Sequence, residues 1–275
     1  YIGVTGVQTC ALPISPAYAK HLKESGFDLI SLANNHILDF GEVCREQTEQ
    51  TLNALDILWS GRPGTVARIE RKGLKISLIA FHSAPHTHST LDYKTAEKLV
   101  RAEKKLHRLV LVSFHGGAEG FPALHVPFKT EKFMGENRGN VARFAHRMVQ
   151  AGADLVLGSG PHVVRGMEIY RNRLIAYSLG NFATYKAFNL WGFNGIGLIL
   201  EAKLNARGQF IEGRIIPTSQ QEFGIPAYDE KMSAVDLVRL LSHEDFKGTA
   251  VQVAQDGTLC KKGRRNHPHA SRPAK

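Results

Sequence analysis

The sequence lacks several features that would assign it to a familiar class of protein. No apolar run approaches the ~18–20 residues that a membrane-spanning helix needs, and no stretch is repetitive or of low complexity. The three cysteines, at positions 10, 44 and 260, form no CxxC pair and are too few for a disulfide framework. A Walker A loop, a complete Rossmann fingerprint and a G-x-S-x-G nucleophile elbow are also missing. The corresponding classes are therefore not supported.

Acidic residues are absent from the C-terminus, and this accounts for most of the net charge of +10. Residues 261–275 hold six Lys and Arg, so the remaining 260 residues carry only +4. Such a run is typical of a solvated tail, and we expect no nucleic-acid partner. A basic interaction protein acting through this tail is the alternative, and it would require nucleic-acid binding that depends steeply on salt.

The length of 275 residues, with 43% hydrophobic and 22% charged residues, suits one large α/β domain or two small ones. Residues 1–15 (YIGVTGVQTCALPIS) show no helical or strand period and resemble a translated sequencing adapter. We expect a non-native segment there, in place of the native N-terminus and any targeting segment. We expect residues 16–245 to form the domain and residues 246–275 to form a basic, disordered tail.

Helices and strands alternate between these ends. Apolar runs predict strands over 27–33, 74–81, 109–114, 154–157 and 174–178, and periodic patterns predict helices over 16–25, 42–59, 95–107 and 141–150. Residues 196–203 and 210–216 are predicted to pair as a hairpin around the turn at 205–208. The alternation predicts an α/β fold with a largely parallel, buried sheet, in which ligands bind beyond the carboxyl ends of the strands.

Polar residues follow five of these strands at the same topological place. They are Asn34, Asn35, His36, His82, His115, His162 and Asn181. Because the carboxyl ends of parallel strands share one edge, we expect these side chains to converge. Imidazole and amide ligands suit a divalent transition metal such as Mn, Fe or Zn. This convergence is the main functional signal in the chain.

Each member of the set also fits a structural role. The histidines of the 82–88 loop are equally consistent with a solvated loop. The Asn pair at 34–35 suits a turn, and Asp39 followed by Phe40 suits the start of the next helix. Glu168 alternates with apolar neighbours, as a solvent-facing strand residue or a partner of Arg165 would.

Four ordered motifs carry a family resemblance. They are 32–36 (LANNH) with Asp39, 114–120 (FHGGAEG), 152–164 (GADLVLGSGPHVV) and 177–182 (YSLGNF). In this order they resemble the CapA family of poly-gamma-glutamate capsule biosynthesis proteins, which is related to the calcineurin-like metallophosphatases. The resemblance spans about residues 16–245. It implies a four-layer αββα sandwich with a divalent-metal centre at the strand ends.

The resemblance also implies roles for individual residues. It makes Asn35, His115 and His162 metal ligands and His36 the general acid, with Asp39 orienting its ring. It makes the remaining candidates contacts to the substrate or to the ligands, namely Asn34, Glu119, His125, Arg165 and Asn181. A metal would lower the pKa of a bound water to roughly 7. A nearby imidazole would protonate the leaving group.

Two departures from the family pattern limit this prediction. The superfamily's first motif, a Gly-Asp whose carboxylate is a metal ligand, has no counterpart in the chain. Many relatives carry histidine where this chain has Ser159 or Gly160, neither of which is a good transition-metal ligand. We therefore expect a mononuclear, weak or empty site.

The resemblance predicts a phosphoesterase-like metal hydrolase of capsular poly-gamma-glutamate synthesis. The alternative is a non-catalytic partner in the synthesis or export of an anionic polymer. Either function implies an anionic cell-envelope polymer, or its precursor, as ligand, and membrane-bound capsule synthesis proteins as partners. It also implies a membrane-associated or extracytoplasmic location.

Overall fold

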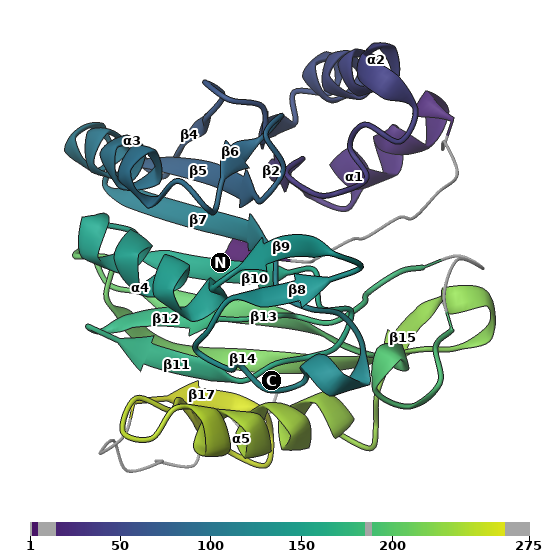
Figure 1. Ribbon diagram of the computed structural model, residues 1–275, viewed down its shortest axis with the longest axis vertical. Coiled ribbons are helices and arrows are strands. Elements are labelled where there is room, and N and C mark those ends of the chain that lie inside the picture. Colours follow the sequence, from purple (N-terminus) through teal and green to yellow (C-terminus); the bar gives the residue numbers. More distant parts are fainter. Residues whose placement is uncertain (1, 5–14, 185–188, 262–275) are drawn as a thin grey trace, which may run out of the picture.

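Four buried parallel strands form the centre of the larger of the two main sheets in the computed structural model, which describes residues 2–4, 15–184 and 189–261 (Figure 1). They are β5 (Leu74–His82), β7 (Leu109–His115), β10 (Leu155–Ser159) and β12 (Arg173–Ala176). β4 (Ala67–Arg71) and β11 (Met167–Tyr170) flank them in the antiparallel sense, and β6 (His88–Ser89) pairs with β5. Near-continuous apolar runs are what strands buried on both faces require.

The second sheet is antiparallel. Its strands, in order, are β1 (Ile2–Val4), β13 (Ile196–Leu204), β14 (Phe210–Gln220), β17 (Thr258–Cys260) and β16 (Gln252–Val253), with β15 (Pro226–Tyr228) paired to β14. β13 and β14 form the predicted hairpin, and the Asn205 side chain accepts hydrogen bonds from the backbone N–H groups of Arg207 and Gln209 in its turn. This turn chemistry fixes the hairpin register.

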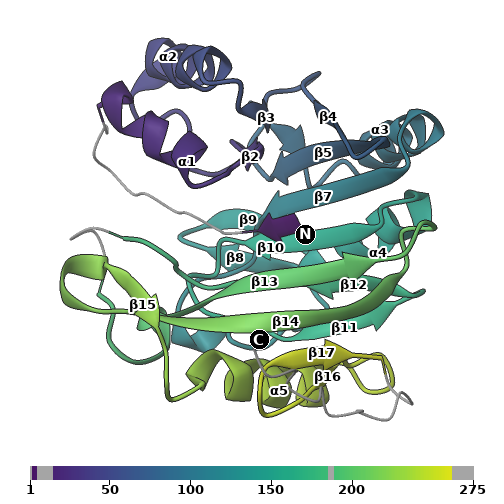
Figure 2. The same cartoon turned by 180° about the vertical axis from the view of Figure 1, so that it is seen from behind.

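The two sheets stack face to face, with helices outside them (Figure 2). One core lies between the sheets, where Leu111 and Leu157 of the larger sheet meet Leu198 and Ile215 of the second. The other core lies beneath α3 (Tyr93–Leu106) and α4 (Val141–Ala151), which cover the outer face of the larger sheet. α5 (Ser233–Asp245) packs along β13, β14 and β16 and reaches β11. The predicted α/β sandwich is therefore confirmed.

Smaller elements complete the described part of the chain. An N-terminal helical segment, η1 (Pro16–Ala19) with α1 (Lys20–Glu24), lies beside α2 (Gly41–Ala54) and the parallel pair β2 (Leu29–Ser31) and β3 (Leu58–Ser60). A hairpin of β8 (Glu131–Phe133) and β9 (Glu136–Gly139) follows the short helix η2 (Phe121–Ala123). Two further short helices are η3 (Gly192–Gly195) and η4 (Glu222–Gly224).

Two predicted boundaries are wrong by more than four residues. The helix predicted over 42–59 ends at Ala54, because Asp56 adopts a positive φ of 51° and the chain continues into β3. The predicted disordered tail at 246–275 begins too early, because β16 and β17 extend the second sheet and Phe246, Val251 and Leu259 are buried. Residues 262–275, and all of the predicted non-native segment except 2–4 and Ser15, lie outside the described residues. In the described part of the chain, no helix is both long and apolar enough to span a bilayer.

Candidate functional site

Three neighbouring strand ends place His82, His115 and Ser159 in one row. His82 at the end of β5 pairs in register with His115 at the end of β7, which in turn pairs with Ser159 at the end of β10. The two imidazole rings meet edge to face, with centroids 5.2 Å apart. The parallel register thus brings together two of the residues that the sequence predicts to converge, His82 and His115. At the third position of this row, the end of β10, the chain has a serine and not a histidine.

His82 presents an N–H group rather than a lone pair at Nε2. Its Nδ1 accepts a hydrogen bond of 3.0 Å from the backbone N–H of Ala84, so the neutral ring carries its proton on Nε2. Burial, followed by the charge of Arg138, lowers the pKa of His82 to about 3. Neither His82, 2% exposed, nor His88, 9% exposed, belongs to a solvated loop, so that alternative is wrong. His82 Nε2, which lies 3.5 Å from Ser83 Oγ, is therefore a hydrogen-bond donor in this tautomer and not a metal ligand.

His115 has the opposite tautomer. Ser159 Oγ lies 3.3 Å from both the Phe114 carbonyl oxygen and His115 Nδ1. Because the hydroxyl donates its one proton to the carbonyl, it accepts from Nδ1, and the lone pair of the neutral ring lies on Nε2. Burial lowers the pKa of His115 well below its ordinary value, with smaller contributions from His82 and His162. His115 is therefore a neutral imidazole at neutral pH.

His162 is held in the same tautomer by Asn181. The Asn181 side-chain N–H group donates to the backbone carbonyl oxygens of His162 and Asn194 at 3.1 and 3.0 Å, which turns its Oδ1 toward the His162 ring. His162 Nδ1 donates to this oxygen at 2.8 Å, so the lone pair lies on Nε2. Burial lowers the pKa of His162, opposed by the hydrogen bond to Asn181. Asn181 is fully buried and acts on the site through His162.

Replacing Asn181 by leucine is expected to weaken binding of Zn²⁺ or Mn²⁺ by about 10- to 100-fold, since His162 would lose the acceptor that fixes its tautomer. Calorimetric titration of the metal into the dialysed protein measures this change. Asn53→Leu is the matched control, because it removes an exposed side-chain bond, to Trp59, away from the site. Equal metal affinity in the Asn181→Leu variant and the wild type would contradict the assigned role.

Asn35, His36 and Asp39 form a compact turn after β2. Asp39 Oδ2 accepts from His36 Nδ1 at 2.7 Å, and Asn35 Nδ2 lies 3.2 Å from His36 Nε2. Asn34 Oδ1 accepts from the His36 backbone N–H at 2.8 Å, so Asn34 shapes the turn. A charge on His36 would lower the pKa of His82, His115, His162 and Glu119, as expected if the turn lies near these groups.

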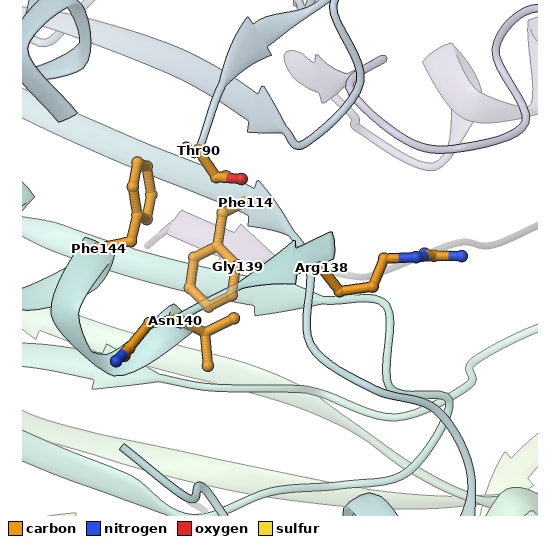
Figure 3. A pocket seen from close by; sticks show the side chains of 7 residues that line it. Thr90, Phe114, Arg138, Gly139, Asn140 and Phe144 are labelled. Atoms are coloured by element: carbon orange, nitrogen blue, oxygen red, sulfur yellow. The ribbon is translucent and has the colours of Figure 1, made fainter. Parts of the chain in front are cut away.

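Glu119 links the histidines to a buried arginine that the sequence did not indicate. Glu119 Oε2 lies 3.6 Å from His162 Nε2, and Oε1 lies 3.3 Å from Arg138 Nη2. Burial raises the pKa of Glu119, opposed by the charge of Arg138. Arg138, on β9, directs its side chain away from a small hollow that it lines with Thr90, Phe114 and Phe144 (Figure 3).

Two predicted site residues lie elsewhere. His125 is exposed and hydrogen-bonds Asp245 of α5 at 2.8 Å. Arg165 is fully buried, and its guanidinium pairs with Glu131. Glu168 neither faces solvent nor pairs with Arg165, because it is buried and accepts hydrogen bonds from Tyr177, Thr249 and His146. These groups stabilise the fold.

The donor types around the cluster fit a divalent metal, although the ligands are not preassembled. Among the described residues, no three His, Cys, Asp or Glu side chains lie close enough together to hold a metal ion. Asn35 Oδ1, however, is buried and has no hydrogen-bond partner in this part of the chain. A buried carbonyl oxygen without a partner costs free energy, which a cation would recover. The imidazoles of His115 and His162, whose pKa values are lowered by burial, are of the nitrogen donor type that such a metal prefers.

Comparison with known proteins gives a family match and distant relatives. The family model described as "Bacterial capsule synthesis protein PGA_cap" matches residues 5–186. The capsule biosynthesis protein CapA of Bacillus anthracis is 24% identical over 270 residues, covering 91% of this chain and 61% of that protein. The PGA biosynthesis protein CapA of Bacillus subtilis (strain 168) is 26% identical over 180 residues, covering 59% and 44%. The chain therefore spans less than two thirds of either relative.

A solved structure gives a weaker likeness. A 5'-nucleotidase precursor from Thermus thermophilus is 12% identical, covering 83% of this chain and 45% of that one, with a TM-score of 0.43.

Proposed function

The chain belongs to the bacterial capsule synthesis protein PGA_cap family, and from this premise we propose that its strand-end site is a metal-dependent hydrolase centre. The proposed substrate is a phosphoester, or an amide or ester bond, of an anionic cell-envelope polymer such as poly-gamma-glutamate. The observations that support the proposal best are the fixed tautomers of His115 and His162 and the buried Oδ1 of Asn35, which has no hydrogen-bond partner among the described residues. Chemistry of this kind needs ligands held ready in one protonation state.

The residues that would hold the metal are Asn35, His115 and His162, with Glu119 beside His162. A bound divalent metal supplies a Lewis acid and a water molecule of lowered pKa. Ser159 occupies the strand-end position next to His115 and offers only a hydroxyl, which makes one metal per chain the expected stoichiometry.

His36 is the proposed proton donor to the leaving group. Its side chain is 29% exposed, whereas His82 and His115 are both 2% exposed, so His36 is the imidazole that a substrate reaches most easily. Asp39 holds its Nδ1, so the proton for transfer would be the one on Nε2 of the protonated ring, where Asn35 Nδ2 lies 3.2 Å away. A general acid positioned in this way typically contributes 10²–10⁴-fold to the rate.

Replacing His36 by alanine is expected to lower kcat/KM by about 100-fold or more on any substrate that the wild type hydrolyses. The measurement is turnover of a panel of phosphoesters, esters and γ-linked glutamyl amides, with Mn²⁺, Co²⁺, Ni²⁺, Fe²⁺ or Zn²⁺ added in turn. His21→Ala is the matched control, since His21 pairs with Glu24 on the exposed side of α1. No metal-dependent turnover, or full activity in His36→Ala, would reject the proposal.

The second candidate is a non-catalytic partner in the synthesis or export of the polymer. It is supported by the lack of a preassembled three-ligand metal group among the described residues. Poly-gamma-glutamate binding that survives in the His36→Ala and His115→Ala variants, without turnover in the wild type, would favour it. Either candidate implies membrane-bound capsule synthesis proteins as partners and a location at the cell envelope.

A further inference from the structure

We propose that Arg138 binds an anionic oxygen group of the ligand, either a carboxylate or a phosphate. This inference rests on the strand-end cluster being a ligand site, as in the proposed function, and it names the group that the site recognises. It requires neither a metal nor turnover.

The backbone places Arg138 at the cluster. The Arg138 carbonyl oxygen accepts a hydrogen bond of 3.0 Å from the N–H of Gly117, two residues beyond His115. A β-carbon on Gly116 would lie 2.9 Å from the same oxygen, so the chains pack too closely for any side chain there. β9 is therefore fixed against the loop that carries His115 and Glu119.

Arg138 brings a permanent positive charge to the cluster. Its Nη2 lies 3.3 Å from Glu119 Oε1, and Glu119 Oε2 lies 3.6 Å from His162 Nε2. An arginine guanidinium stays protonated in proteins, so an anion that enters the cluster would meet a cation there.

The Arg138 guanidinium retains unused donors. Its side chain is 4% exposed, and Nε and Nη1 have no hydrogen-bond partner among the described residues. Nη2 faces Glu119, and Glu136 Oε2 lies 2.9 Å from Nε without hydrogen-bond geometry. The Glu136 side chain is 60% exposed, so it is the partner that a ligand anion can replace. A buried N–H group without a hydrogen-bond acceptor costs free energy. A carboxylate or phosphate can accept hydrogen bonds from two guanidinium N–H groups at once.

The test is calorimetric titration of inorganic phosphate and, separately, glutarate into the full chain at pH 7, low salt and excess EDTA. We expect at least one anion to bind, and Arg138→Gln to weaken it at least about tenfold, as for a lost charged hydrogen bond. Arg143→Gln is the matched control, because that exposed arginine stacks on Tyr93 of α3. Glu136→Gln should tighten binding by up to about fivefold, since it removes a competing carboxylate.

Each outcome decides the proposal. Phosphate binding alone identifies a phosphoryl group as the ligand, and glutarate binding alone identifies a carboxylate. No binding of either anion, or equal affinity in Arg138→Gln and the wild type, overturns the proposal. If Arg138→Gln does not fold, Glu136→Gln decides, because unchanged or weaker binding counts against the assignment. Loss of anion binding in Arg138→Gln without any hydrolysis by the wild type would retain this subsite and reject only the hydrolase.

Discussion

Replacing Arg165 by methionine is expected to lower the free energy of unfolding by about 3–5 kcal/mol, because it leaves a buried carboxylate without its cation. The Arg165 guanidinium is fully buried and donates to both Glu131 oxygens, at 3.1 and 2.6 Å. Its Nε donates to the Ala123 carbonyl oxygen at 2.6 Å, while Glu131 also accepts from the Ala118 N–H at 3.0 Å. With a further bond of 3.4 Å from Arg165 Nη2 to the Ala118 carbonyl oxygen, five hydrogen bonds hold the loop behind His115.

Urea unfolding at 25 °C measures this change, and Lys203→Met is the control. Lys203 pairs with Glu212 on the surface, with side chains 64% and 45% exposed, so its loss should cost no more than about 1 kcal/mol. The double variant Arg165→Met/Glu131→Gln should be less destabilised than the sum of the two single variants. A change below about 1 kcal/mol in Arg165→Met would show that the buried pair is not needed for stability.

The same arginine shows where prediction from sequence succeeds and fails. The parallel strands were predictable because each is a short apolar run followed by a polar loop, and the parallel register alone then brings His82 next to His115. Arg165 lies in the connection between β10 and β11, and nothing local distinguishes a buried, paired guanidinium from one that faces a ligand. Only the fold reveals that Glu131, 34 residues away, is its partner.

The sequence places His125 in the site wrongly and misses Arg138 for a related reason. His125 follows Glu119 closely in the sequence, but η2 turns the chain toward α5, where Asp245 holds the imidazole. Arg138 belongs to the β8–β9 hairpin and does not follow a strand of the larger sheet. A search for polar residues at the ends of the predicted strands therefore does not find it. Its place beside the cluster depends on a tertiary backbone hydrogen bond to Gly117. Sequence patterns locate the edge of the sheet, whereas loops from elsewhere complete the site.

Acid is expected to destabilise the metal-free protein from about pH 6.5 downward. This pH is higher than the range near pH 4 in which ordinary carboxylates titrate. Burial is the main cause that lowers the pKa of His82, His86, His88, His115 and His162. In the unfolded chain each ring has a pKa near 6.5 and binds a proton that the folded chain rejects. The stabilisation is therefore complete above about pH 6.5 and decreases as the pH falls toward the folded-state value, about 3 for His82.

His82 alone should cost about 2 kcal/mol of stability between pH 6.5 and pH 5, since each unit of proton linkage is worth about 1.4 kcal/mol. Urea unfolding at pH 7, 6 and 5 with excess EDTA measures the slope, in a range where few carboxylates titrate. The His82→Gln variant should be less stable at pH 7. Its stability should also fall less steeply between pH 7 and pH 5, because glutamine does not titrate and no buried imidazole has to stay neutral at this position. His243→Gln, on the exposed side of α5, should keep the wild-type slope, since this ring is in solvent in both states. Equal stability of the wild type at pH 7 and pH 5 would mean that the cluster accepts protons without unfolding, so that its imidazoles open to water.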